Sequence, residues 1–285
     1  MIIFIAALNP TLLRLLFFLN ATIKLAVLDM LLTLFPRLTP GSSVEALEDG
    51  HWLLTIPAGP AGKYRWAQLD DYMQLRRGKF LWQPPVTLTL RARLSQLNLP
   101  GTWGFGFWND PFNASLGLGG TARRTPALPD TAWFFYGSPA NYLALRDDHP
   151  ANGLLAAVFA SKRIPPVLLA LGLPLAPLLA WPLTARLLRR LGRRFIGEGA
   201  AELATDVSGW HEYQLELFPG LARFVLDGRS VFETALAPRS RLGFVLWIDN
   251  QYAAFPPNGR LRFGTLENPA PAWLEVADIK IDRRA

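Results

Sequence analysis

Three aspartates are the residues of this chain that best fit acid–base chemistry. Asp110, Asp130 and Asp249 each adjoin a predicted strand, so their carboxyl groups can converge across neighbouring strands. Two carboxyl groups held close together supply a nucleophile and a general acid. However, no two acids alternate along one face of the segment 130–136, and an acid directly after Pro129 is typical of a solvated turn. The three aspartates therefore remain weak catalytic candidates.

An aromatic and polar cluster near residue 250 is the second candidate site. Trp247 and Asp249 share one face of a predicted strand because side chains alternate with period two, and Asn250 and Tyr252 lead into the next loop. An indole ring can stack on a ligand while carboxylate and amide groups bind its polar atoms. The alternative is that Trp247 fills the core and Asp249 begins a turn.

Aromatic residues and glycines alternate between Trp103 and Trp108, which gives this stretch one aromatic face and one nearly bare face. Glycine in a strand lets a ligand or another backbone approach closely, or marks a bulge. Trp103, Trp108 and Trp133 join the candidate ligand contacts. Core packing is nevertheless expected for at least two of Trp103, Phe105 and Phe107.

Several kinds of site lack a starting residue. The chain has no cysteine, which removes disulfides and thiolate ligands, and its three histidines are too scattered for a metal site or a catalytic triad. Phosphate-binding glycine loops, nucleophile elbows and zinc-protease motifs are also missing from the sequence. We therefore expect no metal and no cofactor.

The elements that must position the candidate residues are mainly strands. Apolar residues make up 51% of the chain and charged residues 18%, with 24 prolines and 23 glycines, which favours short strands and many turns. Residues 86–94 alternate apolar and polar side chains as a half-buried strand does. The other predicted strands are 103–108, 131–136, 142–146, 212–218, 222–226, 242–248 and 274–281. Asp227-Gly228 marks a hairpin, and one sandwich domain over 41–285 accounts for the pattern.

Residues 1–40 are interpreted as an apolar, helical N-terminal segment. Helical spacing is seen in Leu12, Leu15, Leu16, Leu19, Ile23, Val27 and Met30. Such a helix lies either on the domain or on a bilayer. The first charge is Arg14, so a cleavable signal peptide is not expected, and translation from Met30 is a further alternative. The predicted location is the membrane periphery or the cytoplasm.

An apolar insertion within 153–205 interrupts the strand pattern. Residues 164–185 carry no charge but five prolines, so they are long enough to span a bilayer but too rich in proline for one straight helix. Arginines interspersed with leucines follow, as in helices that lie among anionic headgroups. The predicted membrane contacts are Trp181, Arg186, Arg189, Arg190, Arg193 and Arg194. The alternative is a lid folded over the sandwich with its arginines in water.

The net charge of +7 does not indicate a nucleic-acid partner. Much of the excess lies in the arginines that follow the uncharged stretch. Nucleic-acid binding needs a basic face with stacking aromatics or a known module, and neither is found in the sequence.

The order of the motifs resembles a known family. Residues 209–217 read GWHEYQLEL and residues 224–228 read FVLDG, which together resemble the "WHxYxIEW…FYVDG" signature of family 16 glycoside hydrolases and other concanavalin A-like lectin/glucanase domains. The stretch 101–108 is similar to "GTWPAFW", and 80–94 and 273–281 fall in the order of the entering and closing strands. The resemblance implies an all-β, concanavalin A-like jelly-roll β-sandwich.

The resemblance also implies a concave sheet that binds a glycan on aromatic platforms, with an ExDxE strand in the hydrolases. Residues 130–136 lack these paired carboxylates, so family 16 glycosidase activity is not expected, and whether the protein is an enzyme stays open. The function predicted first is lectin-like, non-hydrolytic binding of a glycan or glycolipid at an anionic membrane surface. The alternatives are a lipid- or isoprenoid-binding protein or enzyme whose apolar cleft is gated by the insertion, and a diverged glycoside hydrolase. Convergent Asp, Asn and Gln beside an exposed tryptophan favour a sugar, whereas a closed aromatic tunnel favours a lipid.

Overall fold

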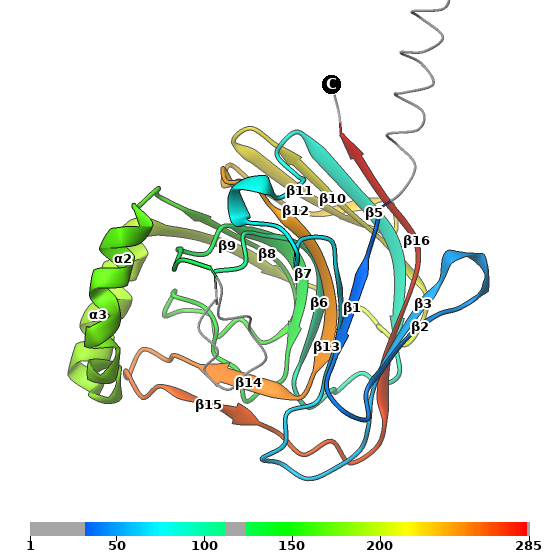
Figure 1. The fold of residues 1–285 in the computed structure, drawn as a ribbon, viewed down its shortest axis with the longest axis horizontal. Coiled ribbons are helices and arrows are strands. Elements are labelled where there is room, and N and C mark those ends of the chain that lie inside the picture. The colour runs from blue at the N-terminus through cyan, green and yellow to red at the C-terminus, as the bar shows by residue number, and fades with distance from the viewer. Residues whose placement is uncertain (1–31, 112–123, 284–285) are drawn as a thin grey trace, which may run out of the picture. The chain divides into compact units, whose positions relative to one another are not determined.

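The computed structural model describes residues 32–111 and 124–283. Two seven-stranded sheets, in which neighbouring strands are antiparallel, face each other in this part of the chain (Figure 1). Sheet A has the strand order β1 (Phe35–Leu38), β4 (Trp66–Asp70), β13 (Gly243–Asp249), β6 (Thr102–Trp108), β7 (Thr131–Gly137), β8 (Gly153–Ser161), β9 (Ile196–Glu202). Sheet B has the strand order β12 (Arg229–Thr234), β11 (Leu221–Leu226), β10 (His211–Phe218), β5 (Val86–Leu94), β16 (Ala272–Arg283), β3 (Trp52–Ile56), β2 (Ser43–Ala46). This strand pairing confirms the predicted all-β sandwich.

The core between the sheets is made largely of aromatic rings. Tyr213 of β10 contacts Phe105 of β6 and Phe134 of β7, with ring centroids 5.0 Å apart in both pairs. Phe134 also meets Phe224 of β11 edge to face at 5.2 Å. Because side chains alternate along a strand, these positions leave the neighbouring residues of β6 and β7 on the outer face of sheet A.

The predicted N-terminal boundary of the domain differs from the first strand of the sheets. β1 pairs with β4 as an edge of sheet A, so the sandwich begins before the predicted boundary at residue 41. The helical segment predicted for residues 1–40 falls mostly on residues 1–31, which lie outside the described residues. At the other end, the predicted hairpin at Asp227-Gly228 is confirmed, because both residues have positive φ and join β11 to β12.

The predicted insertion is narrower than 153–205. β8 and β9 lie inside that range and pair along the whole of β9, from Leu155 with Glu202 to Ser161 with Ile196. The part outside the sheets is residues 162–195, here named the helical excursion. It contains α2 (Pro166–Gly172), the 3-10 helix η3 (Leu173–Ala180) and α3 (Pro182–Phe195). Proline occupies the second position of η3 and the first position of α3, which is why three short helices form in place of one.

The predicted strand 142–146 is wrong. Tyr142 makes only an isolated bridge with Ala254, and the following residues form a loop. Side chains take up the backbone groups that a strand would have paired. Glu198 accepts hydrogen bonds from the N–H groups of Leu145 and Arg146, and Arg189 donates to the carbonyls of Ala144 and Arg146.

Candidate functional site

A cavity of about 580 Å³ lies on the outer face of sheet A. Its floor is made of side chains that alternate with those of the core, among them Thr102 and Trp108 of β6, Trp133 and Phe135 of β7 and Trp247 of β13. The volume falls in the usual range for small-molecule sites. The cavity lining includes nine further aromatic or aliphatic side chains of the walls: Tyr64, Trp66, Tyr142, Leu143, Leu145, Tyr252, Phe255, Leu261 and Phe263.

Two glycines of β6 make room for the floor of the cavity. A Cβ atom on Gly104 would lie 2.9 Å from the Trp247 ring, and one on Gly106 would lie 2.7 Å from Cβ of Trp133. The bare face that alternates with Trp103, Phe105 and Phe107 therefore admits tryptophan side chains from the strands on either side. This is the reason for the glycine pattern of β6, because a Cβ atom at either position would clash with the backbone of β7 and with one of the two tryptophans.

Four rings form what we name the aromatic floor: Trp108, Trp133, Phe135 and Trp247. The Trp133 centroid lies 5.9 Å from Trp108, 5.5 Å from Phe135 and 5.4 Å from Trp247. The indole N–H of Trp247 donates to the Thr102 hydroxyl at 3.0 Å, which fixes the direction of the ring. Trp108 and Trp133 are half-buried, so part of each ring faces the cavity.

Asp249 is a buried carboxyl group at the end of the aromatic floor. Its Oδ1 atom accepts hydrogen bonds from the Thr102 hydroxyl at 2.8 Å and from the N–H groups of Thr102 and Gln251. The Tyr64 hydroxyl donates to Oδ2 at 3.4 Å, a long contact. Burial raises the pKa of Asp249 to about 7, against the opposing effect of these hydrogen bonds. Burial also raises the pKa of Tyr64, so the phenol stays protonated at neutral pH.

Three other polar side chains of the cavity, Gln68, Asn141 and Asp110, are bound to the protein itself, whereas Thr131 Oγ1 and Trp108 Nε1 are buried with no partner among the described residues. Gln68 donates to Asp70 at 2.8 Å, and Asn141 donates to Ser138 and accepts from the Ala253 N–H. Asp110 forms an ion pair with Arg124. These three groups are therefore largely occupied before any ligand arrives.

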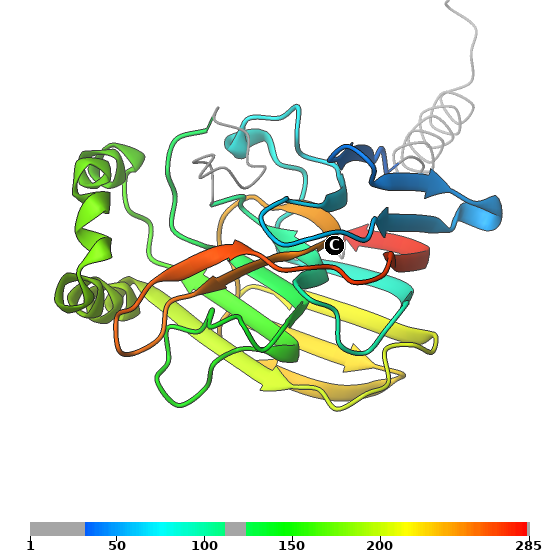
Figure 2. The same cartoon turned by 90° about the horizontal axis from the view of Figure 1, so that it is seen from below.

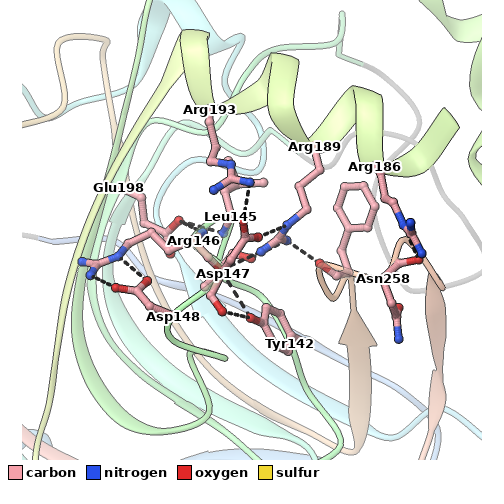
Figure 3. A network of polar contacts seen from close by, with 12 residues as sticks. Tyr142, Leu145, Arg146, Asp147, Asp148, Arg186, Arg189, Arg193, Glu198 and Asn258 are labelled. Carbon is pink, nitrogen blue, oxygen red and sulfur yellow. Dashed lines mark hydrogen bonds and ion pairs between the residues drawn. The ribbon is translucent and has the colours of Figure 1, made fainter. Parts of the chain in front are cut away.

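Two segments outside the sheets wall the cavity. One is the loop 138–150, and the other is the ribbon of β14 (Gln251–Ala254) and β15 (Arg262–Thr265), which extends toward the helices in Figure 2. α3 holds both in place: Arg189 donates to the carbonyls of Ala144, Arg146 and Phe255, and Arg186 donates to the Asn258 carbonyl. Figure 3 shows Arg189 and Arg193 directed from α3 toward Asp147.

The structure brings together five of the predicted ligand contacts, because Trp108, Trp133, Trp247, Asp249 and Tyr252 all line the cavity. Of the three aspartates, Asp110 and Asp249 also line it. Sequence reasoning missed Tyr64 and Trp66, although the alternating residues of 66–70 carry the signal of a strand whose face includes Trp66 and Gln68.

Three predicted site residues lie elsewhere. Trp103 is 1% exposed and stacks on Tyr136 between the sheets. Asn250 is buried and bonded to the backbone of Lys63, Arg65 and Leu266. Asp130 is also buried, which corrects the prediction of a solvated turn: its Oδ2 atom accepts from the N–H groups of residues 239 and 240.

The predicted membrane contacts are exposed with one exception. Trp181, Arg186, Arg190, Arg193 and Arg194 are exposed. Arg189 is 2% exposed, so the prediction is wrong for this residue. Within residues 32–111 and 124–283, no cluster of His, Asp or Glu could hold a metal ion, and no helix is long and apolar enough to cross a membrane.

Comparisons with known proteins give similar structures only. No protein-family model matches the chain, and no curated protein sequence matches it. The catalytic domain of LamA from Zobellia galactanivorans is similar at a TM-score of 0.44 and 12% identity, over 83% of this chain and 79% of that one. The Emp47p carbohydrate recognition domain is similar at a TM-score of 0.43 and 12% identity, over 88% of this chain and 89% of that one.

A third similar structure is the Bacillus licheniformis β-glucanase, with a TM-score of 0.44 and 9% identity over 87% of this chain and 92% of that one. Because these TM-scores and identities are low, the assignment of a sandwich depends on the strand pairing of the chain itself.

Proposed function

We propose that the cavity binds a mainly apolar small molecule of lipid or isoprenoid-like chemistry. The observation that carries this proposal is the contrast between the rings that line the cavity and the polar groups beside them. The four rings of the aromatic floor offer apolar surface, whereas Gln68, Asn141 and Asp110 are occupied by partners within the protein. Burial of apolar ligand surface against such rings is favourable, and none of these three polar side chains has to lose its partner.

Asp249 gives the proposed ligand an orientation. With a pKa of about 7, its carboxyl group is protonated in a large part of the molecules at neutral pH, and among the described residues Oδ2 has only the long contact with Tyr64. A neutral carboxyl group can donate to a hydroxyl or carbonyl oxygen, whereas it offers no ion pair to a charged head group. We therefore place one neutral polar group of the ligand at Asp249.

A glycan is the second candidate, and the half-buried rings of Trp108 and Trp133 favour it. Tryptophan faces of this kind stack on sugar rings as well as on lipids. Sugars also need several hydrogen-bonding groups, and three of the polar side chains described above are already bonded. Non-hydrolytic binding stays a prediction, as does membrane association, which depends on the helical excursion.

The test is a titration of the full chain with farnesol and, separately, with laminaritetraose, followed by tryptophan fluorescence and calorimetry. We expect farnesol to bind and laminaritetraose to show no saturable binding. Trp133→Ala should weaken farnesol binding by about 1.5–3 kcal/mol because it removes a ring from the floor. Trp273→Ala is the matched control, since this half-buried tryptophan lies on β16 of sheet B. Binding of the tetrasaccharide alone, lost in Trp133→Ala, would establish the glycan instead.

A further inference from the structure

α3 faces the protein with the side that carries Ala185 and Arg189, the two buried residues of this helix. Three of its four leucines lie on a different side. Leu183, Leu187 and Leu191 recur at intervals of four and are 78%, 55% and 38% exposed. This arrangement reverses the usual one, in which the apolar side of a surface helix packs on the core.

Polar contacts explain why α3 is held in this orientation. The Arg189 guanidinium is surrounded by the carbonyls of Ala144, Arg146 and Phe255 and by the Asp147 carboxylate (Figure 3). A buried arginine needs such a full set of acceptors, and here the loop 142–147 supplies most of them. Polar contacts therefore attach α3, and Leu183 and Leu187 stay more than half exposed.

The rest of the helical excursion is equally apolar on its surface. Val167, Leu168 and Leu171 of α2 are exposed, and so is Trp181 between η3 and α3. Large exposed groups of apolar side chains mark surfaces that bind something else. We name Leu183, Leu187 and Leu191 the apolar face of α3.

The charges around this face identify the kind of partner. Residues 162–195 contain seven lysines or arginines and no acidic residue. Arg190 and Arg194 are exposed and each follows a leucine of the apolar face by three residues, which places them beside that face. Leucine flanked by arginine on one exposed helix is the pattern of a helix that lies in the headgroup region of an anionic bilayer.

We propose that the helical excursion is a membrane-docking surface, with the apolar face of α3 in the headgroup region and Arg190 and Arg194 on anionic lipids. The proposed attachment is peripheral, and no helix among the described residues is long and apolar enough to cross a membrane. The proposal does not depend on what the cavity binds. The proposed partner of the helical excursion is a bilayer and not a second protein, because all charges of residues 162–195 are positive.

The experiment uses the full chain and vesicles of phosphatidylcholine with about 30% phosphatidylglycerol, which give an anionic surface. We expect co-sedimentation that falls partly with salt. Arg190→Gln with Arg194→Gln should lower the affinity by about 25-fold at low salt, at about fivefold per arginine. Arg76→Gln with Arg229→Gln is the control, since both arginines are exposed on other elements.

The apolar part is tested by Leu183→Gln, Leu187→Gln and Leu191→Gln together, which keeps helix propensity high. The triple variant should lose at least about tenfold in affinity at all salt concentrations. Exposed leucines elsewhere, Leu38, Leu81 and Leu97, give the matched control when changed to Gln. Thermal unfolding of each variant shows that the sandwich is intact.

Two results would overturn the proposal. Residues 1–31 are also rich in leucine, so equal vesicle binding by the wild type and the triple variant would assign the membrane contact to another segment. Alternatively, the wild type would not bind the vesicles, and light scattering would detect dimers of the wild type but not of the triple variant. The apolar face of α3 would then be an interface between two copies of the chain.

Discussion

At the scale of single residues, Asp249 combines burial with a polar contact network. Burial raises its pKa to about 7, and its hydrogen bonds from Thr102 and Gln251 oppose the rise without cancelling it. A carboxyl group with a raised pKa binds its proton more tightly in the folded state. Its contribution to stability is therefore fully present below about pH 4 and is lost as the pH rises to about 7.

Asp249→Asn should remove this pH dependence. The amide keeps an oxygen for Thr102 and Gln251 and cannot ionise, so the variant should match the wild type near pH 4. Its free energy of unfolding should exceed that of the wild type by on the order of 4 kcal/mol above pH 7. Denaturant unfolding at pH 4.5, 6 and 8 measures the difference. Asp278→Asn, at an exposed position, is the control. A difference that stays constant with pH would mean that Asp249 is not the titrating group.

The place of Asp249 on the same strand face as Trp247 could be predicted from period-two alternation. Its burial could not, because it depends on Tyr64 and Thr102, which are distant in sequence. Trp103 shows the converse difficulty. Alternation places it opposite Gly104, but only the position of sheet B decides which of the two faces becomes the core.

At the scale of elements, β6 is shaped by its glycines. A Cβ atom on Gly104 would lie 2.5 Å from the Phe134 carbonyl oxygen as well as 2.9 Å from the Trp247 ring. Gly104→Ala should therefore lower the free energy of unfolding by about 1–3 kcal/mol, because backbone or indole has to move. Gly78→Ala, with no atom within 4 Å of the added Cβ, should be close to neutral. Equal unfolding midpoints for the two variants would show that β6 has free space above Gly104.

The strands that were predicted and those that were missed differ in their patterns. β5, β10 and β13 alternate or lie beside turn residues, and their positions follow from the sequence. The sequence pattern predicts β8 and β9 as part of the insertion, because GLLAAVFAS is almost entirely apolar and IGEGAAE consists largely of small residues. In the segment 142–146 the alternation is real, but Glu198 and Arg189 bind the backbone groups that a partner strand would need.

At the scale of the whole molecule, the helical excursion is a connection between two paired neighbours. Ser161 of β8 lies opposite Ile196 of β9, so a two-residue turn can join them. Most apolar side chains of α3 point outward, and its buried residues are Ala185 and Arg189. Removal of the helical excursion should therefore expose little apolar surface that is now buried.

Replacement of residues 162–195 by Asn-Gly should leave a sandwich that unfolds cooperatively. The carbonyls of Ala144, Arg146 and Phe255 would then turn to water. Arg189→Met, in contrast, keeps these carbonyls covered by α3 while it removes their donor, and each buried acceptor left unpaired costs about 1–3 kcal/mol. We therefore expect the single substitution to destabilise the protein more than loss of the entire excursion does.

Denaturant unfolding of both variants, with Arg193→Gln as an exposed control on α3, measures this order. Hydrogen exchange at residues 144–147 should be faster in the replacement variant, because its loop has lost the cover of the helix. If the replacement variant instead unfolded more easily than Arg189→Met, the excursion would contribute packing to the sandwich. The outward leucines of α3 would then be part of the folding core, and the cavity wall would depend on the helix through apolar contacts in place of the Arg189 hydrogen bonds.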